Sequence, residues 1–196
     1  MEDKAWKAAA ITEQLRGIRA AIRPCPFYKI MPEMPGFAVD AFRYGRVEGI
    51  RGYFLTYVQS PKCGLISRHF HSDHYGGMTA NWSHGPIYCS SITGSLVLQQ
   101  IKVAPEYVIK LPMHQTVNVE GVDVTLIEAN QYFDITLEAN SSCPGSVLFL
   151  FEKKMGKRTF RILHCGDFRA DPLHVNHPAI RGKYLDAVYL DTTYLK

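Results

Sequence analysis

Short segments rich in β-branched and aromatic residues follow one another along most of this chain, and turn-forming residues separate them. There are nine such segments, at residues 37–40, 52–58, 87–89, 107–110, 117–119, 122–128, 146–151, 159–164 and 187–191. Runs of this kind are typical of strands. Residues 91–102 form the one internal segment that we expect to be helical, and Ser90 is placed to cap it. Because residues 147–151 are apolar without alternation, we expect helices to cover at least one face of the sheets.

The size and composition of the chain are those of a single folded domain. Its 196 residues are 46% hydrophobic and 20% charged, a balance that excludes intrinsic disorder for most of the chain. The longest apolar run, residues 147–151, is far shorter than the roughly 20 residues that span a bilayer, and no secretory signal is visible. We therefore expect a soluble intracellular protein without membrane contact. The net charge of +4 permits a nucleic-acid partner, but ordinary solubility explains it equally well.

An N-terminal segment precedes the β-rich region. Apolar residues between positions 3 and 22 recur at roughly helical spacing, and Pro24 and Pro26 end the predicted helix. We expect residues 1–24 to form an N-terminal helix or linker and residues 25–196 to form the domain. The five cysteines are scattered and include no C-x-x-C pair, which argues against a disulfide framework and against a cysteine-based zinc site.

A cluster of histidines carries the strongest chemical signal and reads His69-Phe-His71-Ser-Asp73-His74. At the end of a strand, His69 and His71 point to the same side because side chains alternate with a period of two. The chain then turns towards two glycines, which brings Asp73 and His74 to the same place. Imidazole and carboxylate ligands suit zinc or manganese. The spacing therefore predicts a metal site, and the alternative is a histidine-rich surface turn.

Two further carboxylates are candidates for the same site. Asp167 follows the apolar segment 160–165 closely, and Gly166 allows a neighbouring backbone to approach, so Asp167 is placed to bridge two metal ions. Asp40 ends the first predicted strand, where we expect it to accept a hydrogen bond from a ligand histidine and fix the tautomer of that ring. A strand-end turn without such a role is the alternative for Asp40.

The histidine cluster, followed by Tyr75-Gly76-Gly77, resembles the signature of the metallo-β-lactamase fold. The surrounding sequence is similar to a narrower group, the DNA cross-link repair nucleases of the metallo-β-lactamase/β-CASP family, in the branch that repairs interstrand cross-links. This similarity runs from about residue 25 to the C-terminus. It rests on motifs spread along the chain: Pro26-Phe-Tyr-Lys29, Val39-Asp40-Ala-Phe42, Ser90-x-Ile-Thr93-Gly94, Cys143-Pro-Gly145, Gly166-Asp-Phe-Arg169 and Leu190-Asp-Thr-Thr-Tyr194.

The resemblance implies an α/β (α+β) fold, the αββα sandwich of the metallo-β-lactamases, truncated here and without its β-CASP domain. It implies a metal-dependent 5′→3′ DNA exonuclease, a hydrolase that acts in interstrand cross-link repair in the nucleus. The implied cofactor is one or two divalent ions, Zn²⁺ or else Mg²⁺ or Mn²⁺, and the implied partners are DNA 5′ ends, damaged DNA and repair proteins. The implied metal ligands are His69, His71, Asp73, His74 and Asp167.

The resemblance also assigns roles beyond metal binding. Asp73 and Asp167 are the expected catalytic carboxylates, and Asp73 would orient the attacking water. Arg169 is the candidate for holding a phosphate of the DNA backbone.

The chain departs from the family pattern at three places. Ser142 stands where the family has a ligand histidine, and residues 57–68 and 131–142 are additional segments. The chain also stops at Lys196, before the β-CASP domain. One hypothesis is that the additional segments are translated introns, because a histidine codon split by an intron would read as glutamine and serine, as at Gln131 and Ser142. A local duplication is the alternative.

Two other functions stay open at this point. A non-catalytic protein that binds DNA or a repair partner is favoured by Ser142, whereas the intact histidine cluster favours an enzyme. The second is another hydrolase of the metallo-β-lactamase fold, acting on RNA ends or on a small ester, because a fold alone does not fix a substrate. Metal stoichiometry distinguishes an enzyme from a non-catalytic protein.

Overall fold

The computed structural model describes residues 25, 26, 29, 31–58, 74–129, 145–168 and 170–190. All nine predicted strands are present, with shifts of a few residues at their ends. They are β1 (Phe37–Val39), β2 (Gly52–Phe54), β3 (Ile87–Ser90), β4 (Val108–Leu111), β5 (Thr116–Val119), β6 (Val122–Glu128), β7 (Val147–Met155), β8 (Arg158–His164) and β9 (Ala187–Tyr189). The predicted N-terminal helix and the two additional segments, apart from residues 57 and 58, lie outside the described residues.

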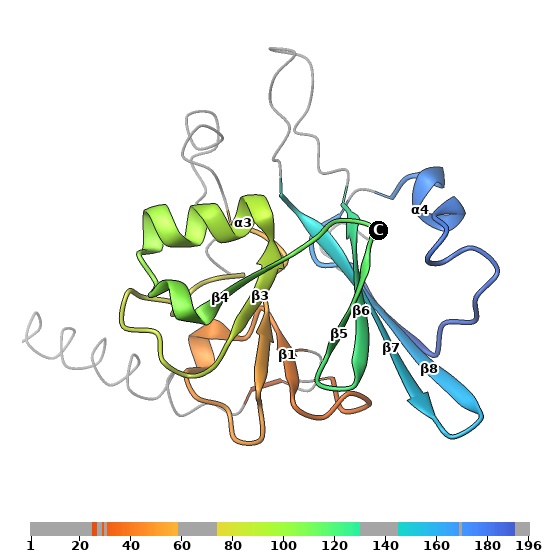
Figure 1. Ribbon diagram of the computed structural model, residues 1–196, viewed down its shortest axis with the longest axis horizontal. Coiled ribbons are helices and arrows are strands. Elements are labelled where there is room, and N and C mark those ends of the chain that lie inside the picture. The colour runs from red at the N-terminus through yellow and green to blue at the C-terminus, as the bar shows by residue number, and fades with distance from the viewer. Residues whose placement is uncertain are drawn as a thin grey trace, which may run out of the picture.

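The strands form two sheets (Figure 1). The first has the order β1-β2-β3-β4, and all of its strands are parallel. The second has the order β5-β6-β7-β8-β9 and is antiparallel except where β9 joins β8. Between β5 and β6, Glu120 and Gly121 both have positive φ, as a two-residue hairpin turn requires, and Gly156 has the same property between β7 and β8.

The two sheets pack face to face around an apolar core rich in aromatic rings. The ring centroid of Phe54 in β2 lies 4.9 Å from that of Phe151 and 5.3 Å from that of Phe149, both in β7. The Phe54 ring also stacks on Tyr88 of β3 at a centroid distance of 5.0 Å. Aromatic pairs of this kind contribute about 0.5–1.5 kcal/mol each beyond the area that they bury. The aromatic cluster therefore joins the two sheets.

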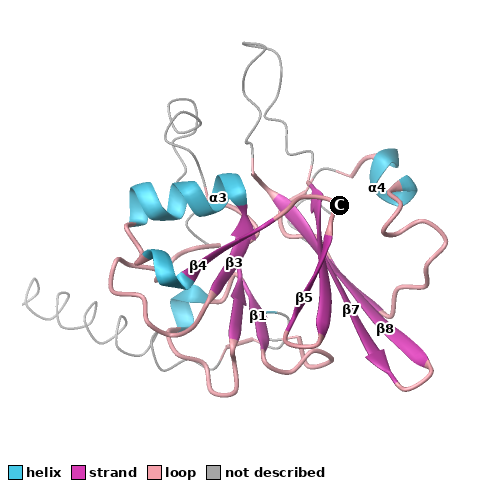
Figure 2. Cartoon of the chain, in the orientation of Figure 1, coloured by secondary structure: helices cyan, strands magenta, loops and turns pink. Residues whose placement is uncertain are grey.

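A helix covers the outer face of the first sheet, and the segment that contains α4 covers that of the second (Figure 2). On the first sheet, α3 (Ser91–Leu96) continues into a π-helical turn (Val97–Ile101), which packs on buried side chains of β1, β2 and β3. On the second sheet, residues on either side of α4 (Pro172–Asn176) cover buried side chains of β6, β7 and β8. The layers run helix, sheet, sheet, helix, which confirms the predicted αββα sandwich. The apolar run in β7 is fully buried because both of its faces are covered.

The two helices begin at capping residues, of which the sequence predicts one. Ser90 caps α3 as expected, since the Thr93 N–H donates to Ser90 Oγ at 3.2 Å. The start of α4 is a capping box, in which the carboxylate of Asp171 accepts from the Leu173 N–H and His174 Nδ1 accepts from the Asp171 N–H. So short a helix has no periodic pattern, and the sequence does not predict it. Within the described part of the chain, no helix is both long and apolar enough to cross a membrane.

The ends of several strands meet at one edge of the sandwich. Asp40 directly follows β1, Thr56 lies just beyond β2, and Asp167 lies just beyond β8. The carboxyl ends of β1 and β2 lie at the same edge because these strands are parallel. The start of β7 reaches this edge as well, where the Val147 N–H donates to the carbonyl of Thr56 at 3.1 Å. Residues that are distant in the sequence are therefore neighbours here.

Candidate metal centre

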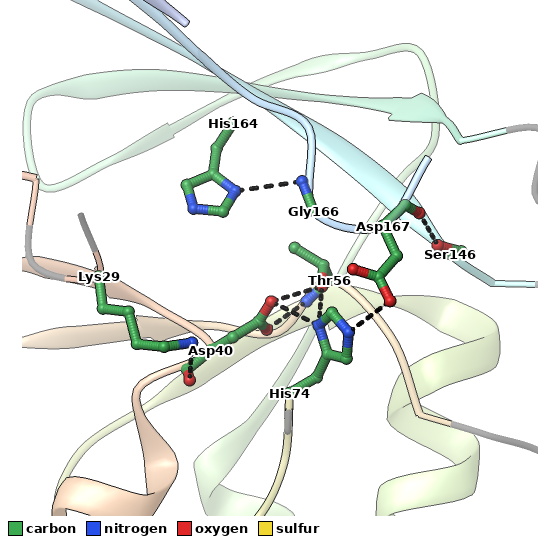
Figure 3. A network of polar contacts seen from close by, with 8 residues as sticks. All are labelled: Lys29, Asp40, Thr56, His74, Ser146, His164, Gly166 and Asp167. Atoms are coloured by element: carbon green, nitrogen blue, oxygen red, sulfur yellow. Dashed lines mark hydrogen bonds and ion pairs between the residues drawn. The ribbon is translucent and has the colours of Figure 1, made fainter. Parts of the chain in front are cut away.

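Three side chains from separate parts of the chain converge at this edge (Figure 3). His74 lies between two carboxylates: its Nδ1 is 2.8 Å from Asp40 Oδ2, and its Nε2 is 2.9 Å from Asp167 Oδ2. The side chains of His74 and Asp40 are buried, whereas that of Asp167 is 31% exposed. Because each ring nitrogen has an acid partner, the orientation of the imidazole is fixed at both ends.

Asp40 is fully engaged by its neighbours. Its Oδ1 accepts from the Thr56 N–H at 3.0 Å, and its Oδ2 accepts from the Thr56 hydroxyl at 2.6 Å in addition to His74. Burial alone would raise the pKa of Asp40, but the charge and hydrogen bond of His74, the charge of Lys29 and the Thr56 hydroxyl hold it below its usual value. Asp40 is thus an ionised carboxylate that orients His74, with its oxygens already occupied by hydrogen bonds.

His74 is an imidazolium in the metal-free protein. Burial alone would lower its pKa, but the carboxylates of Asp40 and Asp167 raise the pKa of His74 to about 11. The ring therefore donates from both nitrogens. Asp40 keeps a proton on Nδ1, so loss of the other proton leaves the lone pair of Nε2 directed towards Asp167. This is the tautomer in which a histidine binds a metal ion through Nε2.

Asp167 is brought close to the first sheet by the glycine before it. Gly166 has a φ of +54°, and a Cβ at this position would lie 2.9 Å from the Cβ of Thr56. The prediction that Gly166 allows a close approach of neighbouring chain is therefore confirmed. On the other side, the hydroxyl of Ser146 donates to the carbonyl of Asp167 at 3.3 Å. The two contacts hold the backbone of Asp167 between β2 and β7.

Three residues around these carboxylates are not predicted by the sequence. Thr56 bonds the Asp40 carboxylate, and the ammonium of Lys29 donates to the main-chain carbonyl of Asp40 at 2.8 Å. His164, at the end of β8, accepts from the Gly166 N–H through Nδ1 at 3.3 Å and stacks on Tyr189. The signals for them in the sequence are weak: Thr56 and His164 lie near the ends of predicted strands, and Lys29 ends the Pro26-Phe-Tyr-Lys29 motif.

His164 differs from His74 in its charge. Burial lowers the pKa of His164 to about 4, and the charges of Lys29 and His74 act in the same direction, against the opposing effect of Asp40. Its ring is therefore neutral at physiological pH. With Nδ1 accepting from Gly166, the proton of the neutral ring lies on Nε2. The charge of Asp40 thus acts on two histidines, one charged and one neutral.

The other predicted site residues fall in parts of the chain that the structure does not describe. His69, His71, Asp73, Ser142 and Arg169 lie outside the described residues. Among the residues that are described, no group of three or more histidine, cysteine, aspartate or glutamate side chains is arranged to hold a metal ion. The described part of the site is therefore the pair of His74 and Asp167, with Asp40 behind it.

The chemistry of this pair fits a divalent ion. An imidazole nitrogen and a carboxylate oxygen are ligands that zinc accepts at about 2.0–2.2 Å. Two ligands on one tetrahedral ion at such distances lie roughly 3.3 Å apart. The 2.9 Å between His74 Nε2 and Asp167 Oδ2 is close to this spacing, so a small separation of the two atoms would admit the ion.

The structure also has weak similarity to solved structures. The similarity to MEM-A1, a subclass B3 metallo-β-lactamase, covers 65% of this chain and 47% of that protein, with a TM-score of 0.36 and 13% sequence identity. The similarity to unliganded yeast PDE1 covers 67% of this chain and 37% of that protein, with a TM-score of 0.45 and 16% identity. No model of a protein family matches the sequence.

Much stronger similarity exists to curated proteins at the level of sequence. The chain is 47% identical over 170 residues to the DNA cross-link repair protein pso2/snm1 of Schizosaccharomyces pombe, which covers 87% of this chain and 26% of that protein. It is 41% identical to the human DNA cross-link repair 1A protein, over 88% of this chain and 14% of the relative. It is 37% identical to the 5′ exonuclease Apollo of Gallus gallus, over 84% of this chain and 30% of the relative.

These alignments cover most of this chain and only a part of each relative. The chain spans about a quarter of the length of the fission yeast protein and less than a third of the other two. The motifs around Asp40, His74 and Asp167 that resemble cross-link repair nucleases lie within this stretch. By its sequence, the chain belongs to the family of DNA cross-link repair proteins that includes pso2/snm1.

Proposed function

We propose that this chain contributes the metal-binding part of a DNA nuclease, a 5′→3′ exonuclease that acts in interstrand cross-link repair. The names of the relatives support this proposal, since they describe cross-link repair proteins and a 5′ exonuclease. The observation that carries it is the chain of contacts from the buried Asp40 through His74 to the partly exposed Asp167. Such a chain is how proteins orient a histidine ligand and set its tautomer.

The proposed cofactor is one or two divalent ions, with zinc the first choice. His74 and Asp167 would hold an ion together with His69, His71 and Asp73. When bound, the ion lowers the pKa of a water molecule and neutralises charge that develops on a phosphate. Nitrogen and oxygen ligands are consistent with zinc or manganese, and magnesium would rely on the carboxylates.

The chain's own residues prepare the site for this chemistry. Asp40 keeps the proton of His74 on Nδ1 and so presents Nε2 on the exposed side of the ring. Thr56 holds the Asp40 carboxylate from two directions and keeps water away from it. Asp167 is 31% exposed, and it would both bind an ion and accept a proton from a water molecule. Asp73 would orient that water, and Arg169 would hold a phosphate of the DNA strand.

The proposed substrate is DNA with a free 5′ end, including damaged DNA, and the proposed place of action is the nucleus. Repair proteins are the proposed protein partners. The mildly basic net charge of +4 is compatible with a polyanionic substrate. The relatives named for cross-link repair carry this part of the proposal.

A second function is favoured by one observation. Ser142 occupies the position of an expected histidine ligand, and a serine hydroxyl is a poor zinc ligand. A chain with an incomplete ligand set would bind DNA or a repair protein without hydrolysing the DNA. The non-catalytic alternative differs from the nuclease in turnover, and in how much metal the site holds.

The test is nuclease activity of the purified chain on 5′-phosphorylated single-stranded DNA, with zinc or magnesium added and the bound metal measured. His71→Ala and Asp167→Ala should abolish cleavage, and Glu106→Ala, at an exposed residue outside the site, should leave it unchanged. A wild-type chain that binds metal and DNA without cleavage would establish the non-catalytic alternative. A wild-type chain that binds neither metal nor DNA would overturn both, and cleavage of RNA in place of DNA would correct the substrate.

A further inference from the structure

The backbone of Asp40 has an unusual conformation. Its φ is +50°, in the left-handed region that residues other than glycine rarely adopt and that persists only where the surroundings hold it. The N–H of Asp40 donates to the carbonyl of Phe54 at 2.9 Å, which fixes one side of the residue to β2. This conformation ends β1 and turns the side chain of Asp40 towards Thr56 and His74.

The other side of the Asp40 backbone is held by Lys29. The Lys29 ammonium donates to the main-chain carbonyl of Asp40 at 2.8 Å (Figure 3). A charged donor makes a stronger hydrogen bond than a neutral one, and it is stronger still away from bulk water. The side chain of Lys29 is partly buried, and its positive charge lies beside a buried carboxylate. Lys29 thus acts on the backbone of Asp40, while Thr56 and His74 act on its side chain.

We propose that Lys29 is a positioning residue for the candidate metal centre. By holding the carbonyl of Asp40, it keeps this residue in the left-handed conformation that directs the carboxylate at Nδ1 of His74. The orientation of His74 then decides where Nε2 points. Metal binding by Nε2 rests on the proposed function, but the orientation of the His74 ring can be measured in the metal-free chain.

A simpler role for Lys29 would be to attach the segment around Pro26 to the first sheet. The Lys29 N–H does bond the carbonyl of Pro26, so this segment has a turn of its own. An attachment of this kind would affect the unfolding temperature and leave the ring of His74 where it is. A positioning role would change the environment of Nδ1 even in a chain that is folded and free of metal.

The experiment compares Lys29→Met, which keeps an apolar stem without charge, with Lys29→Arg, which keeps a charged donor. Lys183→Met is the matched control, because the Lys183 ammonium is also partly buried and bonds a carboxylate, that of Glu152, outside the site. The first measurement is the Nδ1–H proton of His74 by NMR in the metal-free chain, assigned by its loss in His74→Gln. The second is the affinity for Co²⁺, followed by its absorption spectrum.

We expect a protected, downfield Nδ1–H signal in the wild type, in Lys29→Arg and in Lys183→Met. In Lys29→Met this proton should exchange rapidly with water, and the affinity for Co²⁺ should fall about 10–100-fold, as for the loss of other groups that orient a ligand. If Lys29→Met keeps the signal with the exchange rate of the wild type, Lys29 has no positioning role, even where its unfolding temperature falls.

Two further results also bear on the proposal: a Lys29→Met variant that does not fold, and a wild-type chain that binds no Co²⁺. If Lys29→Met does not fold, Lys29→Gln replaces it, because the glutamine amide is uncharged and too short to reach the same carbonyl. Equal protection of the His74 Nδ1–H in Lys29→Gln and Lys29→Arg would then overturn the proposal. A wild-type chain that shows the Nδ1–H signal but binds no Co²⁺ contradicts the proposed function alone. The effect of Lys29 on His74 remains measurable in that chain.

Discussion

Thr56 and His74 are 18 positions apart in the sequence, yet the Thr56 hydroxyl oxygen lies 3.0 Å from His74 Nδ1, and both contact Oδ2 of Asp40. Residues 57–68, which the resemblance marks as an additional segment, lie between them in the sequence. Thr56 and His74, the two residues that flank positions 57–73, are therefore neighbours at the site. Tyr57 and Val58, which open the additional segment, are themselves buried, and the Tyr57 ring lies edge-on to His74.

The second additional segment gives a direct test of the ligand set. The Ala129 N–H donates to the carbonyl of Ser146 at 3.2 Å, so the chain on both sides of residues 131–142 is paired. Replacing these twelve positions by one histidine would restore the family pattern within a short hairpin connection. We expect such a variant to bind Zn²⁺ or Co²⁺ at least about tenfold more tightly than the wild type, because a ligand is added to the ion. The same replacement by one alanine is the control, and equal binding by both variants would contradict a ligand role.

Asp40→Asn removes a charge and keeps the shape of the side chain. We expect the pKa of His74 to fall from about 11, because burial still disfavours the charged ring and one of its two carboxylates is gone. The affinity for metal should fall about 10–100-fold, since the amide no longer fixes the ring as firmly. An NMR titration of His74 and a Co²⁺ titration measure the two effects. An unchanged pKa would show that Asp167 alone sets the charge of His74.

The stability of the metal-free chain should depend on pH through two histidines in opposite ways. The folded pKa of His74 is raised to about 11, so its contribution is fully present below its ordinary value of 6.5 and is lost as the pH rises towards 11. The folded pKa of His164 is lowered to about 4, so its contribution is present above 6.5 and is lost as the pH falls towards 4. Urea unfolding across this range should show the greatest stability near neutral pH. His164→Asn, which cannot be protonated, should flatten the acid side only.

Metal binding should release a proton. At pH 8 the His74 ring carries a proton on Nε2, and an ion bound at this nitrogen must displace it. Calorimetric titration with Zn²⁺ in buffers of different ionisation enthalpy should show the release of about one proton from this ring, in addition to any from water. Zinc binding without proton release would indicate that His74 stays an imidazolium and is not a ligand.

Gly166→Ala should destabilise the fold at the site. The added methyl group would lie 2.9 Å from Thr56 Cβ, and the φ of +54° is unfavourable for alanine, so we expect a loss of about 2–4 kcal/mol in the free energy of unfolding. Gly156→Ala is the matched control, because Gly156 has a φ of +64° and no atom within 4 Å of its would-be Cβ. This control should lose only about 1 kcal/mol. Similar losses in both variants would mean that the contact with Thr56 relaxes.

The strands and the capped helix α3 could be predicted because their signals are local. Alternating or continuous apolar runs and flanking turn residues mark each strand, and Ser90 marks the helix start. The order of the strands within the sheets has no such signal. The same division holds at the site: His74 and Asp167 belong to recognisable motifs, whereas the roles of Lys29 and His164 arise from contacts with the backbone of Asp40 and the ring of Tyr189, which lie on other segments. Contacts of that kind leave no periodic pattern in the sequence.

The candidate centre is built from both sheets, and this has a consequence for how the molecule folds. Asp40 follows a strand of the first sheet and Asp167 a strand of the second, and the His74–Asp167 contact joins residues 93 positions apart. Closing loops of this size is entropically costly, and the loss is recovered only when the two sheets have packed together. An ion bound by these residues would favour the fully assembled sandwich over every partly folded form. Metal release and the separation of the two sheets should therefore occur as one cooperative transition.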